Sequence, residues 1–499
     1  MVKVKRALLS TFDKGGLENL ASTLSKLDVE IISTGGTRDF LHKNGIDTTS
    51  VEELTDFPEM FEGRVKTLHP NIFGAILGPR NNREEFEKFS LKPIDMVVVN
   101  LYPFEKMIGE SKDKLIENID IGGVALLRAG AKNFKYVVVL TNIKDYQLIT
   151  EELIKNKGFV SYELRRYLAG KAFSLTSYYD AMINNYFADD IKRDFALPLK
   201  FIHSLRYGEN PTQEAILYGK PETKFFDIIG GKQLSFNNIS DIDATFRLLK
   251  EFNEPFSAII KHSNPCGAAC GKDVKEAFLR AKASDNISYF GGIVGCNKGV
   301  DKALAEEVIR DFFEVIIAPS FTQDALNILA KKKNLRIIKI SMDTDIGRWD
   351  VKTICGGYLA QQTDDGKKIN FDVVTNITLS EGDKEDLFFA WEIAKHVKSN
   401  AIVITNNKQV LAIGGGETSR IDALRVAELK ASIRKHKLKG AVMASDGFFP
   451  FADSVELASK IGIRAIIQPG GSIRDKEVID KANECKMPMV FTYVRCFRH

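Results

Sequence analysis

The sequence predicts an α/β protein, with an N-terminal doubly wound parallel-sheet domain followed by a larger, duplicated α/β domain. Three observations lead to this class. Continuous β-branched runs, such as residues 96–101 and 136–140, are typical of strands buried on both faces of a parallel sheet. These runs alternate with stretches of helical periodicity. The alternation resumes at Ser257 and begins again near Glu381, which indicates two halves of comparable size without a clear sequence repeat.

Length and composition restrict the classes of protein to consider. A chain of 499 residues is too long for one ordinary core and indicates two to four domains. The net charge of +4 argues against a dedicated nucleic-acid binder, and no apolar run is long enough for a membrane-spanning helix or a signal peptide. Six scattered cysteines without a C-x-x-C pair fit reduced thiols, so we expect a cytoplasmic protein.

The first domain is expected to open with a buried strand at 7–10, a turn at 13–16 and a helix whose apolar face lies within 17–24. A second strand, 29–32, then runs into a Ser/Thr/Gly segment. Such residues at a helix start present backbone N–H groups and hydroxyls to a phosphate, although an ordinary helix cap uses the same residue types. The segment consists of Ser33, Thr34, Gly35, Gly36 and Thr37.

Three polar segments follow strands of the first domain or lie in its loops. They are residues 63–70, 100–104 and 119–124, and the last leads into a helix over 126–133. Together they offer lysine, arginine, aspartate and tyrosine side chains. This set suits an anionic ligand and proton transfer.

A long helix over 165–186 is expected to leave the first domain, followed by an irregular segment at 193–200. The loop 205–211 opens the second domain and places Arg206 beside Tyr207. An arginine there is suited to holding a phosphate, and an ordinary turn explains the loop equally well.

The pair Lys261-His262 contains the main candidate catalytic residues of the second domain. An apolar run at 256–260 predicts a strand, an Asn-Pro break with two glycines predicts a turn, and a helix is expected from Asp273. Chemistry in open α/β sheets lies beyond the carboxyl ends of strands. A histidine base beside a lysine donor suits removal of a proton and stabilisation of an oxyanion, whereas a surface lysine and a core histidine form the structural alternative. Both can face one ligand only if the strand has already ended.

The same segment raises a zinc hypothesis, because Pro265-Cys266 with Cys270 resembles the P-C-x-x-C half of a zinc deaminase. The second cysteine lies one residue too far along, and none of the seven histidines begins an H-x-E. A closed zinc site needs three or four ligands at workable spacing. We therefore expect no metal.

Helices are also expected over 302–313 and 381–398. The glycine triplet at 414–416 fits neither the P-loop nor the dinucleotide fingerprint, so no ATP or NAD site is expected. Asp446 stands beside two aromatic residues, a pocket suited to a flat heteroaromatic ligand, although plain core with a turn aspartate explains this pattern equally well.

With these segments assembled, the chain resembles the bifunctional family that joins AICAR transformylase to IMP cyclohydrolase. The matching segments span nearly the whole chain in order. Departures from the family pattern are Phe12, Thr212 and the region 285–290, which affect single contacts rather than the activity. The matching segments are residues 33–37, 63–70, 100–104, 119–133, 205–211, 261–269, 399–401, 419–422, 445–451, 468–475 and 495–499.

The resemblance implies a cyclohydrolase domain at 1–145 with a methylglyoxal synthase-like fold, a helical linker at 146–199 and a transformylase domain at 200–499. The last is similar to a duplicated cytidine deaminase fold without its zinc, with halves at 200–370 and 371–499. The family transfers a formyl group from 10-formyltetrahydrofolate to AICAR and closes formyl-AICAR to IMP, without a metal. A homodimer is implied, with no nucleic-acid or membrane partner. The alternative from another class is a regulatory protein that senses a purine ribotide without turnover.

By this resemblance His262 takes the proton of the AICAR amine, and Lys261 stabilises the oxyanion on the formyl carbon. Ribotide and folate binding falls to Arg206, Tyr207, Gly291, Asn400, Arg420, Asp446, Arg495 and Phe497, with Asp446 on the folate side. In the first domain, ring closure within one molecule needs only orientation and proton transfer. The residues implied for it are Lys66, Tyr102, Asp120 and Lys132, with ligand binding by Asp13, Lys14, Ser33, Thr34, Gly35, Gly36, Thr37, Arg64, Thr67 and Asn100.

Overall fold

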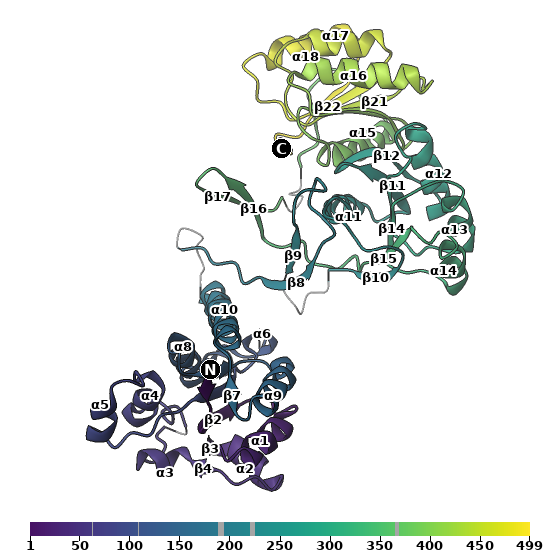
Figure 1. Ribbon diagram of the computed structural model, residues 1–499. Coiled ribbons are helices and arrows are strands. Elements are labelled where there is room, and N and C mark those ends of the chain that lie inside the picture. Colours follow the sequence, from purple (N-terminus) through teal and green to yellow (C-terminus); the bar gives the residue numbers. More distant parts are fainter. Residues whose placement is uncertain (62, 108, 188–193, 220–224, 365–368) are drawn as a thin grey trace. The chain divides into compact units, whose positions relative to one another are not determined.

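The computed structural model describes residues 1–61, 63–107, 109–187, 194–219, 225–364 and 369–499. They form two compact units, Met1–Lys200 and Phe201–His499, each with its own sheets and hydrophobic core (Figure 1). Of the irregular segment expected at 193–200, residue 193 lies outside the described residues. In the described part of the chain, no helix combines the length and apolar character that a membrane crossing requires.

The first unit is built on a five-stranded parallel sheet. Its strands are β2 (Arg6–Thr11), β3 (Glu30–Ser33), β4 (Thr49–Ser50), β5 (Met96–Asn100) and β6 (Val138–Leu140), and the helices among them are α1 (Leu17–Lys26), α2 (Gly35–Lys43), α3 (Val51–Thr55), α4 (Pro70–Leu77), α5 (Arg83–Lys88), α6 (Phe104–Met107), α7 (Lys112–Glu117) and α8 (Gly122–Lys132). The strand order is β4-β3-β2-β5-β6, and every pair is parallel. The carboxyl ends of the strands therefore meet at one edge, where the loops after β2, β3 and β5 gather.

The segment set apart as a helical linker, 146–199, packs on the first unit through residue 187. It contains α9 (Tyr146–Lys155), β7 (Phe159–Val160) and α10 (Tyr162–Phe187). β7 pairs with β1 (Val2–Lys3), and buried residues of α9 and α10 belong to the same core as the sheet. These elements therefore help to stabilise the first unit rather than only leading away from it.

The second unit contains two six-stranded sheets of the same topology. The first consists of β10 (Asp227–Gly230), β11 (Phe256–Lys261), β12 (Asn264–Cys270), β13 (Ile293–Cys296), β14 (Val315–Ala318) and β15 (Arg336–Lys339). The second consists of β18 (Asp372–Val373), β19 (Ile402–Thr405), β20 (Val410–Gly414), β21 (Val442–Ser445), β22 (Ala465–Gln468) and β23 (Met489–Phe491). The orders β10-β15-β14-β13-β11-β12 and β18-β23-β22-β21-β19-β20 match position by position, and matching pairs run alike. The predicted duplication is confirmed.

The helices repeat in the same order. They are α11 (Phe236–Leu249), α12 (Val274–Ser284), α13 (Lys302–Val308) and α14 (Gln323–Leu329) in the first half, and α15 (Glu381–Ala394), α16 (Arg420–Ile433), α17 (Asp453–Lys460) and α18 (Asp475–Glu484) in the second. The helices expected over 302–313 and 381–398 correspond to α13 and α15, and both end before the predicted residue. The halves meet along β12 and β20, where Cys270 N donates to Lys408 O at 3.0 Å. Two further hairpins are β8 (Lys200–Ser204) with β9 (Ile216–Gly219) and β16 (Trp349–Ile354) with β17 (Gly357–Gln362).

One segment differs from its prediction. Residues 264–270, expected as a turn and loop, form strand β12, which pairs with β11 in a tight hairpin around residues 262–263. Pro265 is tolerated because β12 lies at the edge of its sheet and because the register shifts beside it, leaving Cys266 as a bulge. The preceding strand ends at Lys261, where the sequence predicted its end.

Candidate active sites

The first candidate site lies at the carboxyl edge of the parallel sheet, around the start of α2. Ser33 and Thr37 use their hydroxyls within the protein: Ser33 Oγ donates to Leu9 O at 3.1 Å, and Thr37 Oγ1 accepts from Thr11 N at 3.0 Å. No described side chain caps the helix, because the N-cap residue Thr34 makes no capping bond. The first N–H groups of α2 are therefore left for a ligand at the positive end of the helix dipole.

Lys66 stands over this helix start. A Cβ atom added to Gly35 would lie 2.9 Å from Lys66 Nζ, whereas one added to Gly36 would meet nothing within 4 Å. The ammonium is paired with Glu59 at 2.6 Å and with Glu52 at 3.8 Å. The glycines thus leave open space beside a lysine and a helix N-terminus, which suits a phosphate group.

Asn100, at the end of β5, fixes the loop that follows β2. Its Oδ1 accepts from Phe12 N at 2.7 Å and from Asp13 N at 2.9 Å, and its Nδ2 donates to Asp13 O at 2.7 Å. Lys14 Nζ donates to Phe12 O at 3.3 Å. The Phe12 ring, a departure from the family pattern, packs edge-on against Tyr102 with centroids 4.3 Å apart. The departure therefore contributes an aromatic contact to a predicted catalytic tyrosine.

Asp120 precedes α8 and Lys132 ends it, and both line one cavity of about 600 Å³. Asp120 Oδ1 accepts from Gly123 N at 2.7 Å, and its backbone N–H donates to the Tyr179 hydroxyl at 2.8 Å. Burial raises the pKa of the Asp120 carboxyl, although the Gly123 N–H opposes the shift. Tyr179 and Arg128 also line this cavity and were missed from the sequence. Arg128 stands four residues before Lys132, a spacing that places both on one helix face and could have indicated it.

The segment that carries Arg64 and Thr67 connects these two groups of residues. Thr67 is buried, and its Oγ1 lies 3.0 Å from the position of a Cβ atom on Gly122, the first residue of α8. Arg64 pairs with Glu117, with Nε and Oε1 3.0 Å apart. Since Lys66 of the same segment lies over Gly35, the structure brings both groups into one region of the first unit.

The second candidate site is built on the turn between β11 and β12. Lys261 ends β11, and the next two residues, His262 and Ser263, have left-handed backbone conformations with φ angles of 54° and 58°. The strand has thus ended between Lys261 and His262, which is the condition for both side chains to serve one ligand. Both line a cavity of about 560 Å³, with Lys261 Nζ bonded to the Phe290 carbonyl at 2.9 Å.

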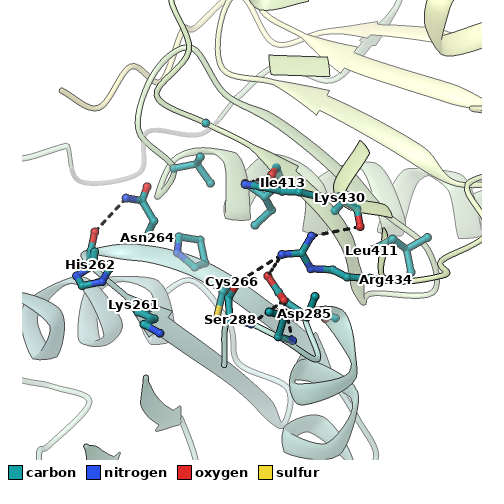
Figure 2. A pocket seen from close by; sticks show the side chains of 16 residues that line it. Lys261, His262, Asn264, Cys266, Asp285, Ser288, Leu411, Ile413, Lys430 and Arg434 are labelled. Carbon is teal, nitrogen blue, oxygen red and sulfur yellow. Dashed lines mark hydrogen bonds and ion pairs between the residues drawn. The ribbon is translucent and has the colours of Figure 1, made fainter. Parts of the chain in front are cut away.

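The opposite wall of this cavity comes from the second half (Figure 2). Arg434, directly after α16, donates to Asp285 Oδ2 at 2.6 Å and to Ser288 Oγ at 3.3 Å, and Lys430 Nζ donates to a β20 carbonyl at 3.0 Å. Burial lowers the pKa of Lys430, and the charge of Arg434 lowers it further. Among the described lining residues, Lys261, Lys430 and Arg434 face a single carboxylate, so the cavity suits an anionic ligand.

Lys430 and Arg434 were missed from the sequence. Their spacing of four residues places them on one helix face, but two like charges at that spacing also describe an ordinary solvated surface. The turn reaches the second half through Asn264, whose Oδ1 accepts from Lys398 N at 3.1 Å. This bond places the turn beside the segment that carries Asn400.

Asn400, Arg420 and Asp446 form a buried polar cluster in the second half. Arg420 Nη1 donates to Asn400 Oδ1 at 2.8 Å, and Arg420 Nη2 lies 3.2 Å from Asp446 Oδ1. The fully buried Asp446 also accepts from Ala401 N at 3.0 Å. Burial lowers the pKa of Arg420, while the charge of Asp446 opposes the shift. Three predicted residues from separate segments of the chain therefore meet in one cluster.

Other predicted residues lie beside this cluster or apart from it. The Phe497 ring centroid lies 5.8 Å from the guanidinium carbon of the cluster and 4.8 Å from that of Arg495. On the loop after β8, Arg206 donates to the Tyr207 hydroxyl at 2.5 Å and lies over its ring. These two residues and Gly291 are not among the described residues that line the cavity of the β11–β12 turn. Their contact with a substrate stays a prediction.

Across the described ranges, no group of three or more histidine, cysteine, aspartate or glutamate side chains is arranged to hold a metal ion. Cys266, the first cysteine of the deaminase-like motif, bonds through Sγ to Ile259 O at 3.3 Å, and burial raises the pKa of its thiol to about 12. Burial also raises the pKa of Cys270, and the charge of Glu254 adds to the shift. Both groups are therefore thiols at neutral pH in the metal-free protein.

Two family models match the chain. One, described as the AICARFT/IMPCHase bienzyme, matches residues 130–430, and the other, described as an MGS-like domain, matches residues 16–125. The chain is 48% identical over 515 aligned residues to the bifunctional purine biosynthesis protein PurH of Caldicellulosiruptor bescii, and 49% identical over 509 residues to PurH of Aquifex aeolicus. Each alignment covers 99% of this chain and 100% of the relative.

Proposed function

The chain belongs to the family of AICARFT/IMPCHase bienzymes and catalyses the last two steps of IMP synthesis, and we propose that each step has its own site. Ring closure takes place in the first unit, which contains the MGS-like domain, and formyl transfer at the β11–β12 turn. One observation carries this assignment: His262 begins a left-handed turn directly after Lys261, so a base and a cationic donor line the same cavity.

Formyl transfer needs help at both reacting atoms, because the lone pair of the AICAR amine is delocalised into the imidazole and the carboxamide. His262 accepts an amine proton as the nitrogen bonds to the formyl carbon of 10-formyltetrahydrofolate, and Lys261 stabilises the oxyanion on that carbon. The bond from this carbon to N10 then breaks, and His262 returns the proton to N10. The products are formyl-AICAR and tetrahydrofolate.

The polar cluster around Arg420 serves to bind and orient the ribotide and the folate. Asn400 and Asp446 hold the Arg420 guanidinium in place, so its remaining N–H groups are presented in a fixed direction. Lys430 and Arg434 add positive charge to the neighbouring cavity, which favours anionic substrates.

Ring closure joins the carboxamide nitrogen to the formyl carbon of the same molecule, with loss of water. Proximity is therefore already supplied, and the site has to orient the substrate and move protons. Asp120 suits proton transfer because burial raises its pKa toward the working pH, and Lys132 lines the same cavity. Lys66 and the first turn of α2 hold the phosphate, with Tyr102 at the adjoining loop.

We propose further that the protein is a cytoplasmic homodimer whose transformylase site takes residues from both subunits. Arg206 and Gly291 lie outside the cavity of the β11–β12 turn, and a second copy can supply them. Ile287 and Phe290, near the rim of this cavity, are 59% and 57% exposed, as expected of apolar groups that a partner covers. The six free cysteines fit a reducing compartment.

The assay that tests this function mixes the protein with AICAR and 10-formyltetrahydrofolate and follows tetrahydrofolate and IMP separately. Both products are expected, and formyl-AICAR supplied alone should give IMP without folate. A ribotide sensor would bind AICAR and release neither product.

A further inference from the structure

Asp241, on α11, holds the turn that carries His262. Its Oδ1 accepts from Ser263 N at 2.6 Å and lies 3.3 Å from Ser263 Oγ. Ser240, its neighbour on α11, adds a contact of 3.0 Å between its hydroxyl and that of Ser263. A left-handed conformation is unfavourable for a residue with a Cβ atom and persists only where the surroundings impose it. Bonds from a neighbouring helix to the turn backbone are such a constraint.

The duplicated half contains the same arrangement at a second turn. Helices α11 and α15 both begin with a capping box, at Ser235 and Ser380. Asp241 and Asp386 each stand six residues after that cap. Asp386 accepts from the backbone N–H groups of residues 407 and 408, at 2.9 and 2.7 Å, and these two residues have φ angles of 51° and 50°. Two equivalent aspartates thus hold two equivalent left-handed hairpin turns.

The two turns differ in what surrounds them. At the second turn, Lys408 is paired with Glu254 at 3.1 Å and with Glu385 at 3.0 Å, and Asp386 itself is paired with Arg464 at 2.8 Å. Both turns border a cavity of about 560 Å³, the second through Asn407 and Lys408. The first turn differs because it carries the imidazole of His262, whereas the lysine of the second turn is held in ion pairs.

We propose that Asp241 is a positioning residue for formyl transfer, which fixes the His262–Ser263 turn so that the imidazole is held beside Lys261 at the cavity. The proposal rests on the assignment of formyl transfer to this turn. Asp241 acts by accepting hydrogen bonds from Ser263, and in the described part of the chain no lysine or arginine is paired with it. An uncharged oxygen at the same place should therefore preserve its function.

The test compares Asp241→Ala, Asp241→Asn and Asp386→Ala in the full chain, with both reactions measured on each preparation. Asp241→Ala should lower the transformylase kcat by about 10²-fold, the loss expected when a catalytic group is misplaced by about 1 Å, with the KM for AICAR nearly unchanged. Asp241→Asn keeps an acceptor for the Ser263 N–H and should stay within about fivefold of wild type. Asp386→Ala, the matched control, should lower the melting temperature and keep the transformylase kcat.

A rescue variant distinguishes the effect of the turn conformation from the effect of the Asp241 charge. Glycine adopts a positive φ without steric cost, so adding Ser263→Gly to Asp241→Ala should raise kcat about tenfold above that of Asp241→Ala alone. If Asp241→Ala gives little folded protein, the transformylase kcat of the double variant is compared with that of Ser263→Gly alone, and this comparison tests the same proposal. A further control, His262→Ala, is assayed beside them.

The outcomes distinguish the proposal from the assignment on which it rests. Wild-type kcat in Asp241→Ala, while His262→Ala is inactive in formyl transfer, overturns the role of Asp241 alone. An Asp241→Asn protein as slow as Asp241→Ala, without recovery by Ser263→Gly, also overturns it, because the charge and not the turn would then matter. Full formyl transfer by His262→Ala shows instead that the site assignment is wrong.

Discussion

Replacing Arg420 by glutamine leaves a carboxylate without its counter-ion in the core of the second unit. The Arg420 side chain is 7% exposed and that of Asp446 is 0% exposed, with 3.2 Å between the paired atoms. Asp446 Oδ1 keeps the bond from Ala401 N at 3.0 Å, and Asp446 Oδ2 has no hydrogen-bond partner among the described residues. One backbone N–H cannot compensate the desolvation of a whole charge.

The expected loss follows from this geometry. Removing one partner of a buried ion pair destabilises a protein by about 3–5 kcal/mol, because the other charge stays buried without compensation. Arg420 also bonds to Asn400 Oδ1 and to Gly447 O, so its removal leaves further acceptors unpaired. Changing Asp446 to asparagine in the same chain removes the uncompensated charge, so the double variant should recover most of the loss.

Tryptophan fluorescence during urea unfolding is a suitable assay, because both tryptophans of the chain, Trp349 and Trp391, lie in the second unit. Protein concentration has to be held fixed, since dimerisation would add to the apparent stability. Cyclohydrolase activity, which we assign to the first unit, serves as the internal control. A loss below about 1 kcal/mol, the range of exposed ion pairs, would refute the reasoning. So would a double variant less stable than Arg420→Gln.

Three further outcomes are expected. Protein purified without chelators should contain no stoichiometric zinc by elemental analysis, and one equivalent whose removal abolishes activity would contradict this. The kcat/KM for ring closure should decline on acidification with an apparent pKa above the ordinary aspartate value of about 3.9, because burial raises the pKa of Asp120 and protonation removes its basic form. If an Asp120→Asn protein shows the same decline at acidic pH, the decline belongs to another group. Mixing His262→Ala with Arg206→Ala chains should restore part of formyl transfer, because the proposed site takes these two residues from different subunits, and a monomer in sedimentation at assay concentration would exclude the shared site.

The sequence predicts elements well where local pattern and tertiary environment agree. Strands β5 and β6 lie in continuous β-branched runs, which are typical of a sheet buried on both faces. Residues 264–270 show the opposite case. Their Asn-Pro pair and Gly267 are typical of a loop, but an edge strand with a bulge at Cys266 tolerates both, and no local pattern shows that the segment lies at an edge.

Local sequence pattern located only one wall of the cavity at the β11–β12 turn. The turn at His262 could be predicted because a strand ends there and reactive side chains follow. The opposite wall could not, since Arg434 meets Asp285 across 149 positions of the chain and no local signal shows which faces of the two halves come together. Asp241 carries no sequence signal of its role, because the residue that it holds, Ser263, lies 22 positions further along the chain.

The most direct test of the two-site assignment measures both reactions on one substitution in each unit. His262→Ala should slow formyl transfer by about 10²–10⁴-fold, the loss typical of a missing general base, and should leave closure of supplied formyl-AICAR near wild type. Lys132→Ala should do the reverse, because Lys132 lines the cavity of the first unit. Each variant receives AICAR with 10-formyltetrahydrofolate in one assay and formyl-AICAR in the other. A His262→Ala protein that loses ring closure as completely as formyl transfer would contradict the assignment.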